Sequence, residues 1–372
     1  MSNEKAVKSS QLTNAVKQMS DYLKGKIDEH TTQLDNVKDS ITEHATQLET
    51  TVSEYNNKMN SMKICAFLTM VNDSYDTSLK TDAQIRKNIN DLKNAKVDGY
   101  GIVVEVMPSY EQCKQFENGE IQESQLRWSV YPNVETFNTY MEIAKENGLV
   151  LRELKFHNLW ARNRGKGHGL NLANFITKYG NAIIEFLNGL TIKPIHATII
   201  NEWTSIQSET TNDNIIVLLN AIKSLGYKTG LTGTEVDSAI IPYVDNFYFH
   251  FYPFITNKKE LATYQDGLDG FEKARLYEKH IEELKNRYPN KKIIIDEVGC
   301  SNYWESLARP EEYLGNKGYI TTSDGMPMAI YANGAIEYFK NYPIDEIYIF
   351  WTDNILSELE KVLIKHGGVK IC

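Results

Sequence analysis

The sequence predicts an α/β protein whose larger part is a (β/α)8 barrel, preceded by a long α-helical coiled-coil segment. Two observations carry this prediction. Residues 1–61 repeat apolar side chains at heptad spacing, and residues 62–372 alternate eight short apolar runs with amphipathic stretches. Runs rich in β-branched residues are typical of strands buried on both faces, as in a parallel barrel. We therefore divide the chain into a stalk, residues 1–61, and a barrel domain, residues 62–372.

The stalk segment contains no proline, tryptophan or phenylalanine, and its eight residues Ile27–Leu34 recur two heptads later as Ile41–Leu48. This repeat keeps the apolar stripe in register. A single helix of this composition is marginal in water, so we expect residues 1–61 to self-associate, with three strands weakly favoured over two. Two histidines on the stripe either form a polar layer that fixes the register or are tolerated defects. The a and d positions are Ile27, His30, Leu34, Val37, Ile41, His44 and Leu48.

Strands and helices alternate throughout the barrel segment, and no glycine-rich dinucleotide or phosphate loop follows any strand. An open nucleotide-binding sheet therefore gains no support. The expected strands are 63–71, 100–106, 149–156, 195–200, 228–232, 246–251, 292–296 and 346–351. The expected helices are 82–96, 133–147, 170–189, 212–225, 272–288, 329–341 and 355–365.

Composition excludes several classes of function. The net charge of −9 argues against a protein that follows the phosphates of a nucleic acid. No run approaches 18 consecutive apolar residues, so we expect no membrane insertion, and the polar N-terminus carries no signal peptide. The protein is thus expected to be made in a cytoplasm. The four cysteines lack metal-ligand spacing, so we expect no metal and no cofactor.

Two glutamates stand at strand ends: Glu202 follows strand four, and Glu297 follows strand seven. The carboxyl ends of barrel strands meet at one face, where the active sites of this fold are built. Glycoside hydrolysis needs a carboxylic acid and a carboxylate on either side of the scissile bond. The spacing therefore predicts a glycosidase site. The neighbouring Asp296 is expected to point the opposite way along the strand and to be structural.

Several strand-end motifs resemble the retaining glycoside hydrolases of clan A, the cellulase, mannanase and galactanase type of TIM barrel, over about residues 63–366. The motifs are Asn201-Glu202 after strand four, Glu297-Val298-Gly299 after strand seven, Phe156-His157-Asn158, His250-Phe251-Tyr252 and Phe350-Trp351. The resemblance implies that Glu202 is the general acid/base and Glu297 the nucleophile. It further implies that the sugar is bound by Asn201, His157, Asn158, His250, Tyr252 and Trp351, and Trp203 and Trp304 are added as candidate walls of the groove.

The chain departs from the clan on strand two, where many members carry an arginine beside the nucleophile and residues 101–106 have none. Arg152, or the pair Arg162 and Arg164, could supply that charge. The leading interpretation is an enzyme that cleaves a poly- or oligosaccharide of a bacterial cell surface or wall. The stalk suits a virion-associated protein such as a phage tail or tail-fibre component. The alternatives are a catalytically silent carbohydrate- or receptor-binding barrel and a structural virion protein.

Overall fold

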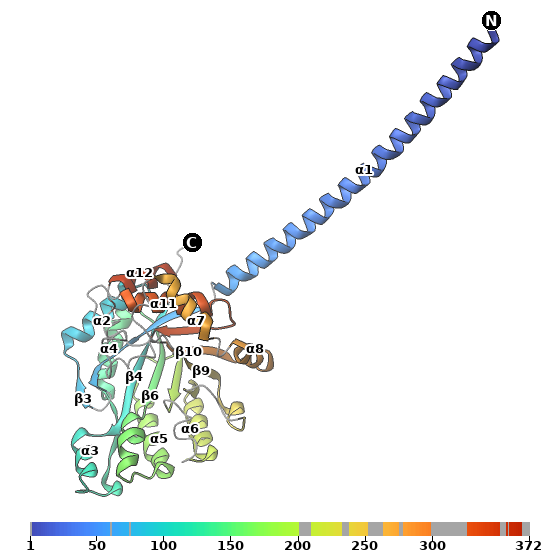
Figure 1. The fold of residues 1–372 in the computed structure, drawn as a ribbon. Coiled ribbons are helices and arrows are strands. Elements are labelled where there is room, and N and C mark those ends of the chain that lie inside the picture. The colour runs from blue at the N-terminus through green and yellow to red at the C-terminus, as the bar shows by residue number, and fades with distance from the viewer. Residues whose placement is uncertain are drawn as a thin grey trace. The chain divides into compact units, whose positions relative to one another are not determined.

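The computed structural model divides the chain into two compact units, residues 1–60 and 61–372 (Figure 1). The structure describes residues 2–59, 62–73, 76–200, 210–232, 238–251, 263–274, 278–298, 326–349, 355 and 357–366. In the first unit, side chains are described for residues 10–50.

The first unit is one continuous helix, α1 (Ser2–Met59). Proline is absent from it, and pairs such as Lys26–Glu29 support the helix one turn apart. Its apolar side chains are not covered: Leu34 is 69% exposed and Ile41 is 64% exposed. A helix of 58 residues that buries none of these side chains has an unpartnered apolar stripe.

The second unit contains eight parallel strands in the order β8-β7-β6-β4-β1-β11-β10-β9, and a parallel bridge between Thr232 and Tyr248 joins the two ends. This is the predicted (β/α)8 barrel. A short strand, β5 (Trp128–Tyr131), adds to β4 in antiparallel orientation. The barrel strands are β1 (Lys63–Leu68), β4 (Gly99–Pro108), β6 (Leu151–His157), β7 (His196–Ile199), β8 (Lys228–Leu231), β9 (Asn246–Phe251), β10 (Lys292–Val298) and β11 (Glu346–Ile349).

Helices surround the strands of this unit (Figure 1). They are α2 (Asp82–Asn94), α3 (Tyr110–Glu117), α4 (Val134–Glu146), α5 (Leu172–Asn188), α6 (Asn212–Ser224), α7 (Tyr264–Ala274), α8 (Glu278–Arg287), α11 (Met326–Phe339) and α12 (Ser357–His366). Short turns of helix are η1 (Glu123–Gln125), η2 (Ala161–Gly165), η3 (Lys166–His168) and η5 (Ile241–Tyr243), and a small hairpin pairs β2 (Val71–Asp73) with β3 (Asp76–Leu79).

Local sequence explains where these elements begin. Thr81 starts α2 through a capping box with Gln84, and Asn133 caps α4 by accepting a hydrogen bond from the Thr136 amide. The prediction of one helix over 272–288 was wrong, because two helices, α7 and α8, occupy this region. The helix α3, strand β5 and the small hairpin were not predicted. These elements are short, and none has a long apolar period.

Apolar side chains fill both layers of the barrel. The larger cluster lies between the strands and the helices, whereas Cys65, Phe67, Tyr248, Ile294 and Tyr348 form a smaller buried cluster of their own. Gly101 of β4 makes this second cluster possible, since a Cβ atom at that position would lie 2.5 Å from Cε1 of Phe67. Other interior positions are polar, and those toward the carboxyl ends of the strands form the candidate site.

Candidate active site

Strand β6 lines the site with polar residues at every second position. Glu153, Lys155 and His157 alternate with Leu154 and Phe156, and all five side chains are buried. Because successive residues of a strand face opposite sides, the three polar residues share one face. Lys155 is fully buried, and a buried ammonium group needs carboxylate partners. Strand β10 provides them.

A β-bulge on β10 brings two consecutive carboxylates to Lys155. The pairing of β10 with β9 and with β11 shifts register just after Ile295. As a result, Asp296 Oδ2 lies 2.8 Å from Lys155 Nζ, and Glu297 Oε1 lies 2.9 Å from it. The expectation that Asp296 points away from Glu297 was therefore wrong. The extra residue of a bulge breaks the strict alternation on which that expectation rested.

Two histidines complete the surroundings of Glu297. Nε2 of His250, on β9, lies 3.4 Å from Glu297 Oε1, and Nε2 of His157 lies 3.8 Å from the same oxygen. The other nitrogen of His157 lies 3.3 Å from Oε1 of Glu105, on β4. The carboxylate of Glu297 is thus enclosed by groups that can carry positive charge.

These contacts decide the charge of the site. Burial raises the pKa of Glu297, but His250, Lys155 and His157 together outweigh burial and hold that pKa well below its usual value. Burial lowers the pKa of His157, whereas Glu105 and Glu297 raise it to a net value above the ordinary one. The site therefore holds Glu297 as a carboxylate and favours a protonated His157.

The structure brings four of the sequence-predicted residues to the carboxyl ends of barrel strands. His157 ends β6 and Asn158 follows it, while His250 and Glu297 stand near the ends of β9 and β10. Asn158 is fully buried, and neither its amide nitrogen nor its amide oxygen has a hydrogen-bond partner among the described residues. The other predicted site residues lie outside the described residues: Asn201, Glu202, Trp203, Tyr252, Trp304 and Trp351.

Ile200 has strained backbone directly before Asn201. Its φ is 58°, a left-handed value that is rare for a β-branched residue, and its side chain is fully buried. Two hydrogen bonds fix this conformation: the Ile200 amide donates to the Tyr179 hydroxyl, and the Thr232 hydroxyl donates to the Ile200 carbonyl. Strain of this kind concentrates at functional sites.

Lys155 places a positive charge directly beside Glu297. Strand β4 has no arginine and contributes Glu105 to this region. Arg152 makes a two-pronged ion pair with Glu346, the first residue of β11.

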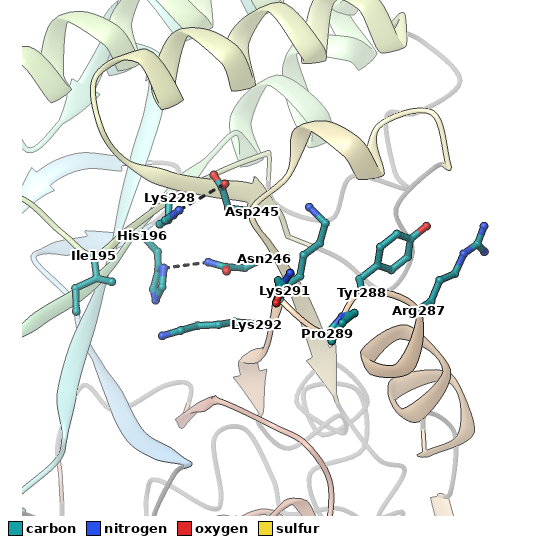
Figure 2. A pocket seen from close by; sticks show the side chains of 11 residues that line it. Ile195, His196, Lys228, Asp245, Asn246, Arg287, Tyr288, Pro289, Lys291 and Lys292 are labelled. Atoms are coloured by element: carbon teal, nitrogen blue, oxygen red, sulfur yellow. Dashed lines mark hydrogen bonds and ion pairs between the residues drawn. The ribbon is translucent and has the colours of Figure 1, made fainter.

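The opposite end of the barrel holds a pocket of about 590 Å³, lined by the amino ends of β7 to β10 and by the segment after α8 (Figure 2). Three lysines line its wall, and each contacts an oxygen atom. Lys228 pairs with Asp245, Lys291 donates to the Val244 carbonyl, and Lys292 pairs with Glu346. The amino ends of barrel strands serve stability, so we assign this end a structural role.

Reasoning from sequence missed Lys155, Glu105 and Asp296. The signal for Lys155 was present, since Glu153, Lys155 and His157 stand two apart in a strand whose other residues are apolar. The signal for Glu105 was a lone acid in the apolar run 101–106. Nothing in the sequence marks the bulge that turns Asp296 inward.

Among the residues that the structure describes, no helix is long and apolar enough to cross a membrane. Within the same ranges, no group of three or more His, Cys, Asp or Glu side chains is arranged to hold a metal ion.

Fold and site together define a class: an eight-stranded α/β barrel that holds a buried, ionised glutamate at the carboxyl ends of its strands. No family model and no curated protein matches the sequence. Among solved structures, the chain is similar to a glycoside hydrolase family 5 enzyme from Prevotella bryantii in complex with a xyloglucan tetradecasaccharide. That match has a TM-score of 0.50 and 12% identity, and it covers 84% of this chain and 98% of the other.

Two more structures have similar barrels. A GH26 β-mannanase from Bacteroides ovatus matches with a TM-score of 0.43 and 11% identity, over 85% of this chain and 92% of the other. A GH5_18 protein from Streptomyces cattleya in complex with GlcNAc matches with a TM-score of 0.46 and 10% identity, over 82% and 79%. At 12% identity, the match to the Prevotella bryantii enzyme supports the fold alone, which is the (β/α)8 barrel.

Proposed function

We propose that this protein is a retaining glycoside hydrolase that cleaves a cell-surface or cell-wall polysaccharide. The observation that carries the proposal is Glu297, a buried glutamate held as a carboxylate at the end of β10 by Lys155, His157 and His250. A nucleophile in this reaction must be ionised before substrate binds. Burial without these partners would have produced the opposite charge state.

In the proposed mechanism Glu297 attacks the anomeric carbon, and the sugar–oxygen bond breaks as Glu202 gives its proton to the leaving oxygen. Water, deprotonated by Glu202, then attacks the glycosyl-enzyme, so the configuration is retained. The two carboxyl groups should lie about 5–5.5 Å apart. The roles of Glu202 and Asn201 rest on their place after β7 and on the clan A motifs.

Two features of the described residues support this assignment. The strained Ile200 stands directly before Asn201 and Glu202, at the position where a strand end would present an acid/base residue. The buried amide of Asn158 has both a donor and an acceptor to offer to a sugar hydroxyl. By the same motifs, His157 and His250 contact the sugar, the Tyr252 hydroxyl contacts Glu297, and Trp351 supplies a stacking surface. Trp203 and Trp304 are candidate walls of the groove.

The test compares Glu297→Gln with wild type on polysaccharides extracted from bacterial surfaces, measuring reducing ends released. We expect release by wild type and none by the variant, with binding of the polymer retained. Glu282→Gln is the matched control, because it makes the same chemical change on an exposed side chain of α8 and should leave the rate unchanged. Proton NMR of the first product should show the retained anomer.

The competing function is a carbohydrate- or receptor-binding barrel without activity. It is favoured by β4, which places Glu105 and not an arginine beside the site. A wild-type protein that binds a surface glycan but releases no reducing ends from any of the extracted polysaccharides would establish this alternative in place of the hydrolase.

We further propose that α1 is a self-associating stalk, with three strands favoured over two. Its stripe of exposed apolar side chains is long enough for several heptads, and burying that stripe between copies removes its contact with water. Such a stalk would display several barrels at a bacterial surface, as in a virion-associated tail protein.

Sedimentation of the full chain tests the stalk. Ile41→Asp places a charge on the stripe and should lower the oligomeric state. Thr46→Asp makes a comparable change at an f position, opposite the stripe, and should not. A wild-type protein that sediments as a monomer at micromolar concentration would exclude the stalk.

A further inference from the structure

The ammonium group of Lys155 is fully buried in the barrel interior. It donates hydrogen bonds to the Asp296 carbonyl at 3.2 Å and to Glu297 Oε1 at 2.9 Å, and it makes an ion pair with Asp296 Oδ2 at 2.8 Å. The centroid of the Phe67 ring lies 5.1 Å from Nζ. Two of the three contacted oxygens belong to Asp296, and the third belongs to the candidate nucleophile.

We propose that Lys155 is a positioning residue that holds the Glu297 carboxylate in place as an anion, and that Asp296 holds Lys155. The inference deepens the proposed function and rests on it for its catalytic consequence. The two acidic residues have different roles, which follow from their contacts. Asp296 binds the ammonium group through both its side chain and its backbone carbonyl and so fixes Nζ. The same ammonium group donates a hydrogen bond to Glu297.

The bulge on β10 is what allows this arrangement. In a regular strand, Asp296 and Glu297 would face opposite sides, and one lysine could not contact both side chains. Because the register shifts after Ile295, Asp296 can bind Lys155 although it stands directly before Glu297, which Lys155 also contacts. Deleting the lysine would leave two buried carboxylates close together, which favours protonation of one of them.

Strands β4, β6 and β9 contribute further ionisable groups around Glu297. His157 on β6 and His250 on β9 reach the same Oε1 atom as Lys155, and Glu105 on β4 supports His157. Glu153, also on β6, faces Lys155, and burial raises its pKa well above the usual value although Lys155 opposes that rise.

Lys155 is a permanent cation in this site. Burial lowers its pKa, but Asp296 and Glu297 outweigh burial and raise it above the ordinary value. A lysine with a raised pKa keeps its positive charge at neutral pH.

The experiment measures the Glu297 carboxyl pKa directly, by carbon-13 NMR of protein labelled at glutamate side-chain carboxyl groups, without substrate. The resonance is assigned as the one missing in Glu297→Gln. We expect wild type to titrate well below 4.5, Lys155→Arg to stay low, and Lys155→Met with Asp296→Asn to rise by about 1–3 pH units. The double variant removes one positive and one negative charge together, so it avoids stranding an extra buried carboxylate.

Arg152→Met with Glu346→Gln is the matched control, since it removes another buried ion pair from the same barrel and should leave the Glu297 titration unchanged. Circular dichroism checks that each variant is folded. A Glu297 titration that moves by less than half a unit in the Lys155 double variant overturns the inference. So does an Lys155→Arg titration that rises as far as that of the double variant.

Activity gives a second readout that separates the two proposals. If wild type cleaves a polysaccharide, the acidic limb of its kcat/KM profile should move upward in the Lys155 double variant by the same amount as the NMR titration. If wild type cleaves nothing while the NMR shift appears, the proposed function fails and the role of Lys155 in holding Glu297 as an anion stands.

Discussion

The charge of Glu346 is predicted to stabilise the fold. Its carboxylate accepts two hydrogen bonds from Arg152, at 2.7 and 3.0 Å, and one from the Tyr348 hydroxyl at 2.9 Å. His196 Nε2 at 3.0 Å and Lys292 Nζ at 3.2 Å contact it as well. The side chain is fully buried, so water cannot replace any partner that is removed.

Changing Glu346 to Gln keeps the shape and removes the charge. One carboxylate oxygen becomes an NH2 group that faces donors, and Arg152 loses its counter-charge while only 12% of its side chain is exposed. Removing one partner of a buried pair costs about 3–5 kcal/mol. We therefore expect the free energy of unfolding in urea at pH 7 to fall by that amount. The double variant that also carries Arg152→Met should lose less, because no unpaired charge remains.

The pH dependence has a defined sign. Burial raises the pKa of Glu346, but hydrogen bonds from His196 and Arg152 hold it below its ordinary value. A depressed folded-state pKa contributes stability that is present above the unfolded pKa near 4.3 and is lost as pH falls through the folded value. Wild type and Glu346→Gln should thus converge in acid. A variant within 1 kcal/mol of wild type at pH 7 would refute the reasoning.

Three further predictions concern packing, capping and titration. Gly101→Ala should lower the free energy of unfolding by about 1–3 kcal/mol through contact with Phe67, while Gly25→Ala, where a Cβ atom meets nothing within 4 Å, should not lower it. Thr81→Ala should cost about 1 kcal/mol in urea unfolding by removing the α2 cap, and an unchanged midpoint would count against it. Burial first, then a neighbouring lysine, lowers the pKa of His366 to about 4. The neutral histidine therefore contributes about 3 kcal/mol to the free energy of unfolding above pH 6.5, and this contribution is lost as pH falls to 4. His366→Gln should make the free energy of unfolding depend less on pH over that range. Parallel pH profiles of wild type and variant would contradict this prediction.

The sequence predicted the barrel because its eight strands are apolar runs separated by helices of ordinary length. The strand count also predicted that His157, His250 and Glu297 share one face, since carboxyl ends of parallel strands meet there, and the structure has both histidines within 4 Å of Glu297. Both conclusions depend on order along the chain, which a sequence contains in full.

The charges around Glu297 depend on register, which the sequence contains only in part. The inward face of β6 was readable from alternation, so Lys155 could have been found there. Asp296 could not, because a single bulge reverses the direction of every side chain after it. Glu105 could be recognised in the sequence as a lone acid in an apolar run. Its partner His157 stands on another strand, so their contact follows only from the folded barrel.

The barrel can close only after its last strand has been synthesised. Strand β1 pairs with β11, and the ladder begins with Lys63 opposite Glu346, positions that differ by 283. A ribosome that adds about 5–20 residues per second needs roughly 15 to 60 s between these two residues. During that interval one edge of β1 has no partner strand, and Arg152 has no Glu346 carboxylate to pair with. The growing chain therefore exposes this edge of β1 until β11 is made, whereas the hydrogen bonds of α1 are local and need no residue far along the chain.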